Sequence, residues 1–253
     1  MRPPHPPLGS YYGSERERSA WVRGIFDRTA TDYDRIERIL GLGTGSWYRR
    51  EALRHAGLEA GMTVVDVGTG TGLLARAAAK IVGDPARVIG VDPSAGMLEH
   101  AKVPAGVRLL AGTAEAVPAP DGSADFLTLG YALRHISDLD SAFAEFYRVL
   151  RPGGRVCMLE ITLPEGKVPR TLLKAWLHGF VPKIARLVAR RRDTPLLMNY
   201  YWDTIAACVP PGTILAALAA GGFVEAERHT DLAVFSVYRA RKPTKSGSRP
   251  LDP

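Results

Sequence analysis

Three glycines and two aspartates provide the residues best suited to hold a cofactor. Residues 64–72 read Val-Val-Asp-Val-Gly-Thr-Gly-Thr-Gly, a short apolar strand that runs into a turn. Glycine allows the backbone of such a turn to adopt positive φ and to approach a ligand closely. Asp92 ends the next apolar run, and a carboxylate there can accept hydrogen bonds from both ribose hydroxyls. The pattern predicts a site for a nucleotide-like cofactor; the alternatives are a purely structural turn and, for Asp92, a plain helix cap.

The spacing of the glycines favours one class of cofactor. A dinucleotide fingerprint requires glycine at position 73, where this chain has Leu73, so hydride transfer is disfavoured. The turn instead resembles the first motif of the class I S-adenosylmethionine (SAM) methyltransferases, in which an acidic residue precedes Gly-x-Gly-x-Gly. The resemblance implies SAM as cofactor, held by Asp66, Gly68, Thr69, Gly70, Gly72 and Asp92.

Alternating strands and helices predict the fold that positions this site. The expected strands are 64–67, 87–91, 107–110, 125–129 and 154–161, and the expected helices between them are 71–82, 94–102 and 139–150. This alternation is typical of stacked βαβ units around a parallel sheet. A last helix over 212–220 and an antiparallel hairpin, 224–229 and 233–239, match the usual ending of class I methyltransferases. We therefore expect an α/β fold: a Rossmann-like, seven-stranded, mostly parallel sheet with helices on both faces and a helical lid.

Length and composition predict one domain with short flanking segments. The 253 residues, 46% of them hydrophobic, suit a single globular domain over 15–240. Residues 1–14, rich in Pro, Gly and Ser, and the basic tail 241–253 are expected to be disordered. Two helical segments, 15–60 and 162–211, are expected over the carboxyl edge of the sheet, where they would form a substrate lid.

The cellular compartment follows from what the chain lacks. No run of eighteen apolar residues occurs, and the N-terminal residues have no apolar centre of a signal peptide, which favours a soluble, cytoplasmic protein. Cys157 and Cys208 offer neither a disulfide framework nor the spacing of a zinc site, and we expect no metal. The net charge of +7 is concentrated in the tail and in residues 167–192.

Further candidate cofactor residues follow the other strands. Pro93 and Met97 come directly after the second strand, and Met97 either lines an adenine pocket or packs in the core. Ala114 and Glu115 follow the third strand, where backbone and polar groups usually read the adenine edge; for Glu115 a solvated turn is the alternative. Gly130 ends the fourth strand, where the backbone is expected to pass the methionine end of SAM.

Several more segments resemble the C-methyltransferase family of menaquinone and ubiquinone biosynthesis, and the similarity runs over about residues 20 to 240. They are Phe-Asp-Arg-Thr-Ala-Thr-Asp-Tyr-Asp at 26–34, Ala-Glu-Ala-Val-Pro at 114–118, Ala-Leu-Arg-His-Ile-Ser-Asp at 132–138, and Tyr-Arg-Val-Leu-Arg-Pro-Gly-Gly at 147–154 with Leu159-Glu160. The resemblance implies carbon methylation of a prenylated quinol. The chain departs from the family pattern at His135 and Glu37, where Asn is usual, and within 199–205. The fold and the cofactor follow from the resemblance more directly than the acceptor does.

The segment after the fourth strand carries the candidate catalytic residues. Carbon methylation needs a base to remove a phenolic proton, and His135 has a reference pKa near working pH; the alternative is a histidine held by neighbouring backbone. Arg134 either orients the acceptor oxygen or pairs with a carboxylate. Tyr33 is expected to close over the cofactor, and Tyr131 and Tyr200 to line the acceptor pocket, although packing alone can also explain such aromatic residues.

Other functions compete with quinol methylation. The same fold could methylate oxygen or nitrogen of a phenolic or secondary-metabolite substrate, or the chain could be a catalytically silent SAM-binding or membrane-associated scaffold. Nucleic acid is not expected as a substrate, because Gly130-Tyr131-Ala132 replaces the Asp/Asn-Pro-Pro-aromatic element that acts on exocyclic amines, although other base-flipping pockets remain open.

The basic segment 167–192 is a candidate surface for membrane contact. It fits either a helix at an anionic membrane surface, which would place the protein at the inner face of the membrane, or a lid helix with a solvated basic face. A homodimer is compatible with the sequence, which does not fix the oligomeric state.

Overall fold

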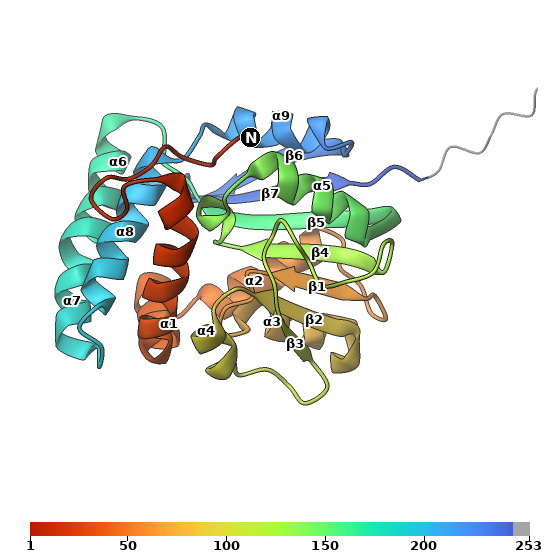
Figure 1. The fold of residues 1–253 in the computed structure, drawn as a ribbon, viewed down its shortest axis with the longest axis horizontal. Coiled ribbons are helices and arrows are strands. Elements are labelled where there is room, and N and C mark those ends of the chain that lie inside the picture. Colours follow the sequence, from red (N-terminus) through yellow and green to blue (C-terminus); the bar gives the residue numbers. More distant parts are fainter. Residues whose placement is uncertain (245–253) are drawn as a thin grey trace, which may run out of the picture.

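The chain folds around one seven-stranded sheet (Figure 1). The computed structural model describes residues 1–244. The strand order is β3-β2-β1-β4-β5-β7-β6. The strands are β1 (Val64–Val67), β2 (Val88–Asp92), β3 (Arg108–Ala111), β4 (Ala124–Gly130), β5 (Leu150–Ile161), β6 (Val224–Asp231) and β7 (Phe235–Arg241). Strands β1 to β5 pair in parallel, and β7 pairs antiparallel with both β5 and β6. The predicted Rossmann-like, mostly parallel sheet is confirmed.

Helices cover both faces of the sheet and one of its ends. They are α1 (Glu15–Leu40), α2 (Gly45–His55), α3 (Leu73–Val82), α4 (Ala95–Glu99), α5 (Leu139–Val149), α6 (Lys167–Lys174), α7 (Val181–Val188), α8 (Thr194–Ala207) and α9 (Pro211–Ala220), with short turns η1 (Pro85–Arg87), η2 (Leu133–His135) and the π-helical η3 (Ala175–Phe180). One buried cluster joins α5 and α9 to the sheet, and a second joins α2 and α3 to it. Figure 1 shows α1, α6, α7 and α8 grouped at one end of the sheet.

Local signals in the sequence explain most boundaries. The strands β1 and β2 are buried along their whole length, as expected for central strands of a parallel sheet. Ser94 caps α4 and Asp138 caps α5 through their side chains, which accept hydrogen bonds from backbone N–H groups. Most elements fall within two residues of their predicted bounds.

Two elements differ more from the prediction. Helix α4 ends at Glu99 rather than 102, because the N–H of Lys102 donates to the carbonyl of Thr71 in the glycine turn at 3.0 Å. Strand β5 begins at Leu150 rather than 154, because Leu150 already pairs with Ala124 before an irregularity in the ladder. In both cases a contact with a neighbouring strand or turn decides the boundary.

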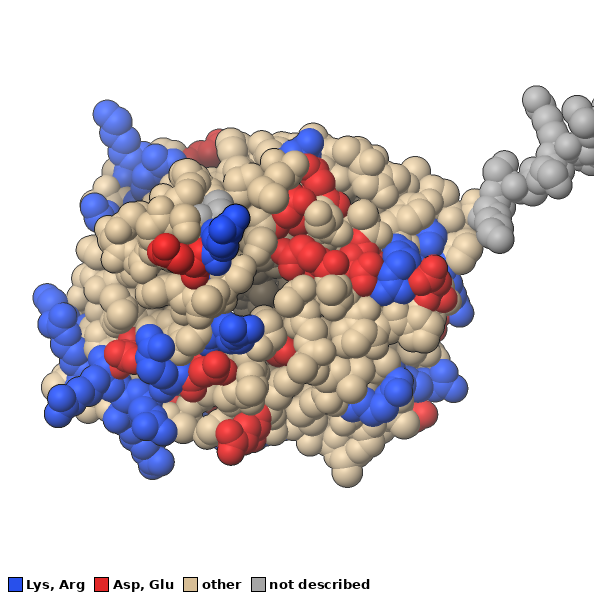
Figure 2. Space-filling view, viewed as in Figure 1, with Lys and Arg blue, Asp and Glu red and all other residues tan. Residues whose placement is uncertain are grey.

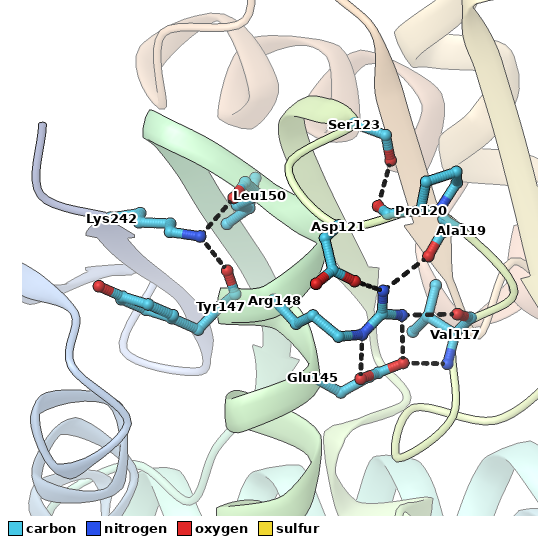
Figure 3. A network of polar contacts seen from close by, with 10 residues as sticks. All are labelled: Val117, Ala119, Pro120, Asp121, Ser123, Glu145, Tyr147, Arg148, Leu150 and Lys242. Atoms are coloured by element: carbon cyan, nitrogen blue, oxygen red, sulfur yellow. Dashed lines mark hydrogen bonds and ion pairs between the residues drawn. The ribbon is translucent and has the colours of Figure 1, made fainter. Parts of the chain in front are cut away.

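Arg148 ties the connection between β3 and β4 to helix α5 (Figure 3). Its guanidinium donates to both carboxylate oxygens of Glu145, at 2.7 and 2.6 Å, and to Asp121 at 2.5 Å. It also donates to the carbonyls of Val117 and Ala119, at 3.0 and 2.9 Å. Such a fork of donors suits arginine. The segment that leads into β4 is therefore fixed from one side chain.

Both chain ends differ in part from the predicted disorder. Residues 1–14 are packed against the domain: His5 is fully buried and Tyr12 is 4% exposed. At the other end, Arg241 closes β7, and the Lys242 ammonium donates to the carbonyls of Tyr147 and Leu150, both at 2.7 Å (Figure 3). The rest of the predicted tail, 245–253, lies outside the described residues.

Over residues 1–244, no single helix combines the length and the apolar composition needed to cross a membrane. Helices α8 and α9 meet that test only as a pair, and they are bent by 75° at the break between them.

Candidate cofactor and acceptor site

The glycine turn has the backbone conformation that the sequence predicts. Gly68, Gly70 and Gly72 have φ of +63°, +55° and +82°, a region that other residues rarely adopt. A Cβ on Gly68 would lie 2.7 Å from the Cβ of Ala132, whereas a Cβ on Gly70 would meet no atom within 4 Å. The turn thus packs tightly on one side and leaves space beside Gly70.

Asp66 shapes this turn from within the protein. It is fully buried and accepts hydrogen bonds from the hydroxyls of Thr69, at 2.7 Å, and Thr128, at 2.6 Å. Burial raises the pKa of its carboxyl to about 6, although these bonds act in the opposite direction. Its contacts are with the turn and with β4, so Asp66 and Thr69 hold the loop in place.

Asp92 lies between the glycine turn and α4. Its carboxylate accepts from the N–H of Gly70 at 2.8 Å and from the N–H of Ser94 at 2.9 Å. Burial raises the pKa of Asp92 to about 6. A carboxylate has about four acceptor positions, so capacity remains for a ribose. Pro93 is exposed beside it, and Met97 is 2% exposed within α4.

Helix α1 closes over this side of the site. Asp27 accepts from the hydroxyl of Ser94 at 2.6 Å and from the N–H of Gly96 at 2.9 Å. Asp34 accepts from the hydroxyl of Thr71 in the glycine turn at 2.5 Å. Figure 2 shows this face of the molecule hollowed near its middle. The segment 26–34 therefore connects α1 to the turn and to α4.

Two further acidic residues connect α1 to the lid and to α2. Asp32 is buried and accepts from the N–H groups of Arg190 and Arg191, at 3.0 and 2.8 Å, at the end of α7. Glu37 pairs with the buried Arg49 of α2 at 2.5 Å. Four acidic side chains of one helix thus bind four separate parts of the structure.

Glu115 contacts the loop after β4. One oxygen of its carboxylate accepts from the N–H of Ser137, at 2.6 Å, and from that of Asp138, at 3.3 Å. Glu115 is therefore not simply a solvated turn residue, and its contact with adenine stays a prediction. The sequence could not show this, because the loop is more than twenty residues away along the chain. Ala114 is buried beside it, and Gly130 ends β4 as predicted.

Arg134 forms a buried ion pair. Its guanidinium pairs with Glu160 of β5, donates to the hydroxyl of Thr204 in α8 at 3.1 Å, and lies 5.2 Å from the ring centre of Tyr201. Of the two roles expected for Arg134, the structure shows the pairing with a carboxylate. This contact joins the loop after β4 to β5 and to the lid.

His135 is a neutral imidazole in an aromatic surrounding. Its ring centre lies 5.2, 5.4 and 6.0 Å from those of Phe26, Tyr200 and Tyr201. Over residues 1–244, neither ring nitrogen has a hydrogen-bond partner. Burial, assisted by the charge of Arg134, holds the pKa of His135 well below its usual value of 6.5. The side chain is therefore not a histidine satisfied by neighbouring backbone.

A large apolar cavity adjoins these residues. It has a volume of about 880 Å³ and lies between α1, α2, η3, α8 and the hairpin of β6 and β7. Trp47 and Leu232, 59% and 85% exposed, mark its rim. Most walls are apolar, and they include Ile36, Ala52, Ile161, Leu173, Trp176, Leu177, Leu197, Met198, Ile205, Val234, Phe235 and Val237. Its polar walls near the cofactor residues come from Tyr33, Tyr131 and Arg134.

The tyrosines at the cavity only partly match the predictions. Tyr131 lines it as predicted, with a left-handed φ of +59° and with the Arg49 guanidinium 5.7 Å from its ring centre. Tyr33 hydrogen-bonds Tyr201, and both line the cavity. Tyr200 is not among the lining residues: it is fully buried among other aromatic rings, because the helix turns it away from its neighbour Tyr201.

Sequence reasoning missed most of the cavity wall. Arg49 and Glu37 come from different helices, and no local pattern pairs them. A usable signal existed only in the lid, where Leu173, Trp176 and Leu177 follow helical spacing and share one face.

Comparisons with known proteins agree with this geometry. The sequence model of the ubiE/COQ5 methyltransferase family matches residues 13–233. The ubiquinone/menaquinone biosynthesis C-methyltransferase UbiE of Shewanella halifaxensis is 30% identical over 192 residues, which cover 73% of this chain and 76% of that protein. The UbiE protein of Hahella chejuensis is 30% identical over 185 residues, covering 70% and 74%. A solved SAM-dependent methyltransferase of Aquifex aeolicus, 18% identical, superposes with a TM-score of 0.56 over 82% of this chain and 97% of its own, which shows a shared fold.

Proposed function

Since this chain belongs to the ubiE/COQ5 methyltransferase family and is a SAM-dependent methyltransferase, we propose that it methylates a ring carbon of a prenylated quinol. The related UbiE proteins are named as C-methyltransferases of ubiquinone and menaquinone biosynthesis. The comparisons offer no support for the alternative of oxygen or nitrogen methylation.

The cavity is the observation that carries this proposal. Its volume of about 880 Å³ and its mostly apolar walls suit a long hydrocarbon tail. Tyr33, Tyr131 and Arg134 supply polar groups for the quinol head. Burial raises the pKa of both tyrosine hydroxyls above the ordinary 10, so they remain neutral and can donate hydrogen bonds to a quinol oxygen.

The residues around the glycine turn fit SAM. Gly70 leaves open space and Asp92 retains acceptor capacity for the ribose. We include Met97, Ala114 and Gly130 in the proposed site because they follow or end the neighbouring strands β2, β3 and β4. When bound, SAM supplies an electrophilic methyl group. The protein then has to align the quinol carbon with that group, and alignment contributes a large part of such a rate.

We propose His135 as the base that accepts the phenolic proton. A neutral imidazole can accept a proton at its unprotonated ring nitrogen, and neither nitrogen of His135 is engaged by another group among residues 1–244. His135 does not line the cavity, whereas its neighbours Arg134 and Tyr201 do, so this role requires the side chains around His135 to move when the quinol binds. Arg134 orients the loop after β4 through its ion pair with Glu160. We also propose that Arg134 contacts the quinol oxygen.

Methyl transfer from labelled SAM to reduced demethylmenaquinone analogues with and without a prenyl tail tests the acceptor. We expect product on a ring carbon and a clear preference for the prenylated quinol. Ile205→Trp, which fills the cavity, should remove that preference, and Leu196→Trp on the exposed side of the same helix should not. Product on an oxygen, or equal rates with and without a tail, would contradict the proposal.

We also propose that the lid contacts an anionic membrane surface. On the outer side of α6, η3 and α7, four apolar side chains are exposed: Val168 by 70%, Leu172 by 66%, Phe180 by 49% and Leu187 by 85%. Exposed basic residues lie among them: Lys167, Arg170, Lys174, Lys183 and Arg186. Figure 2 shows Lys and Arg gathered at the lower left, where Figure 1 places α7 and an end of α1. Apolar and basic side chains on one surface suit an anionic bilayer.

Sedimentation with phosphatidylglycerol vesicles and with phosphatidylcholine vesicles tests this contact. We expect binding to the anionic vesicles, weakened by salt and by the double variant Leu172→Asp, Leu187→Asp. The matched control is the double variant Val224→Asp, Leu232→Asp, which places the same two charges on and beside strand β6, at exposed positions away from the lid helices. Equal sedimentation of the parent and the lid double variant would show that the lid does not bind the vesicles.

A further inference from the structure

The N-terminal arm, residues 1–12, precedes the residues that match the family model. It nevertheless contacts the loop that follows β4. The N–H of Leu139 donates to the carbonyl of Arg2 at 3.0 Å, and the N–H of Arg2 donates to Asp138 at 2.5 Å. Farther along, the N–H of Val209 donates to the carbonyl of Pro4 at 2.8 Å. The arm is thus bonded to the start of α5 and to the segment between α8 and α9.

His5 and Arg18 extend this contact to the candidate catalytic loop. Both side chains are fully buried. The guanidinium of Arg18 donates to the carbonyl of Arg134 at 2.8 Å, and the same nitrogen lies 3.0 Å from Nε2 of His5. Since arginine can only donate, Nε2 is the acceptor, and Nδ1 of His5 carries the proton that it donates to the carbonyl of Pro6 at 2.7 Å. The tautomer of His5 is therefore fixed by its two neighbours.

A second route reaches the same loop through aromatic rings. The ring centre of Tyr11 lies 5.1 Å from that of Trp21 and 5.2 Å from that of Tyr200. Tyr200 in turn stacks on His135 at 5.4 Å. The arm therefore supports the backbone of Arg134 from one side and the ring of His135 from another.

We propose that the arm is a positioning element of this enzyme, and that His5, acting through Arg18, holds the loop 133–138 in the geometry needed for methyl transfer. His5 and Arg18 are positioning residues, since each acts on the loop rather than on a substrate. The inference rests on the proposed function only where it refers to the rate of transfer; the effect on the loop is independent of the acceptor.

Full-length variants separate this role from general stability. His5→Ala removes the acceptor for Arg18, whereas His5→Gln keeps an acceptor oxygen near the position of Nε2. Tyr11→Phe is the matched control, because it breaks only the 2.6 Å bond from the Tyr11 hydroxyl to Asp203 on α8 and keeps the ring. Each variant is measured for kcat, KM, SAM affinity, and hydrogen exchange of the amides in 133–141.

For His5→Ala we expect kcat to fall about 10- to 100-fold, since small displacements of a reacting group have effects of that size. We expect little change in SAM affinity, and faster exchange limited to 133–141. His5→Gln should recover most of both losses, and Tyr11→Phe should match the parent.

Three results would overturn the proposal: unchanged exchange in the loop of His5→Ala, faster exchange spread over the whole chain, or equal losses in His5→Ala and His5→Gln. If His5→Ala does not fold, His5→Asn takes its place, because its shorter amide cannot reach the position of Nε2 and leaves Arg18 without that acceptor. Losses in His5→Asn no larger than those in His5→Gln would overturn the proposal. If the parent protein methylates no quinol, the proposed acceptor fails, while the exchange data still test the arm.

Discussion

The carboxyl of Asp92 allows a prediction that links stability to pH. Its pKa is about 6 in the folded protein, against an ordinary 3.8. Between about pH 4 and pH 6 the folded state keeps a proton that the unfolded state has lost, so the free energy of unfolding decreases as pH rises through this window and is level above it. A shift of about two pKa units corresponds to about 3 kcal/mol.

Asp92→Asn removes this titration while it keeps the size of the side chain. Relative to Asp92→Asn, the parent should therefore be more stable by up to about 3 kcal/mol near pH 4 than it is near pH 7. The variant also replaces one acceptor oxygen by a donor, which opposes the N–H of Gly70 or of Ser94 and costs about 1–3 kcal/mol at every pH.

The same change should weaken SAM binding. If the carboxylate accepts from the ribose, its loss removes a charge-assisted bond of about 1.5–3 kcal/mol, or about 10- to 100-fold in affinity. Urea unfolding from about pH 4 to pH 7.5 and titration calorimetry with SAM measure the two effects separately. A difference between parent and variant that does not vary with pH would refute the argument from burial, and unchanged SAM affinity would refute the role of Asp92 at the ribose.

Three further substitutions test the framework of the site. Arg134→Met leaves Glu160 buried without its partner and should destabilise the fold by about 3–5 kcal/mol in urea unfolding; the double change with Glu160→Gln should recover part of this, and no recovery would mean that the pairing is not the cause. Gly68→Ala meets Ala132 at a positive φ and should cost about 1–3 kcal/mol with weaker SAM binding; an unaffected variant would show that the turn relaxes freely. Arg148→Met should lower the free energy of unfolding by about 2–3 kcal/mol, measured by thermal unfolding, because it releases the segment before β4. A loss no larger than that caused by replacing an exposed arginine with Met would contradict that role.

The sequence was sufficient for the fold and for the cofactor turn. Alternating apolar runs and the glycines of 68–72 are local patterns, and local patterns specify strands, turns and their order. Asp66 and Asp92 could be selected because Asp66 lies two residues before Gly68 and Asp92 ends a strand of a parallel sheet, where such ends meet at one edge.

Residues whose role depends on distant partners could not be assigned in this way. Glu115 bonds the backbone of a loop more than twenty residues away, and Tyr200 and Tyr201 differ only in the direction in which α8 turns them. The proline and glycine content of residues 1–14 predicts disorder because it is typical of a chain without a core. The contacts of the arm with α1, α5 and the segment before α9 depend on residues far away in the sequence.

The separation between the cavity and the glycine turn has a consequence for the order of events. The rim of the cavity lies at Trp47 and Leu232, and among the described residues its walls include neither the glycine turn nor Asp92. We therefore expect the quinol and the nucleoside to enter by different routes, so that neither blocks the other. Steady-state kinetics should follow a random sequence, in which the spent cofactor is exchanged while a lipid product is still bound. A membrane-bound quinol would then bind and be methylated without competing with the cofactor for one entrance.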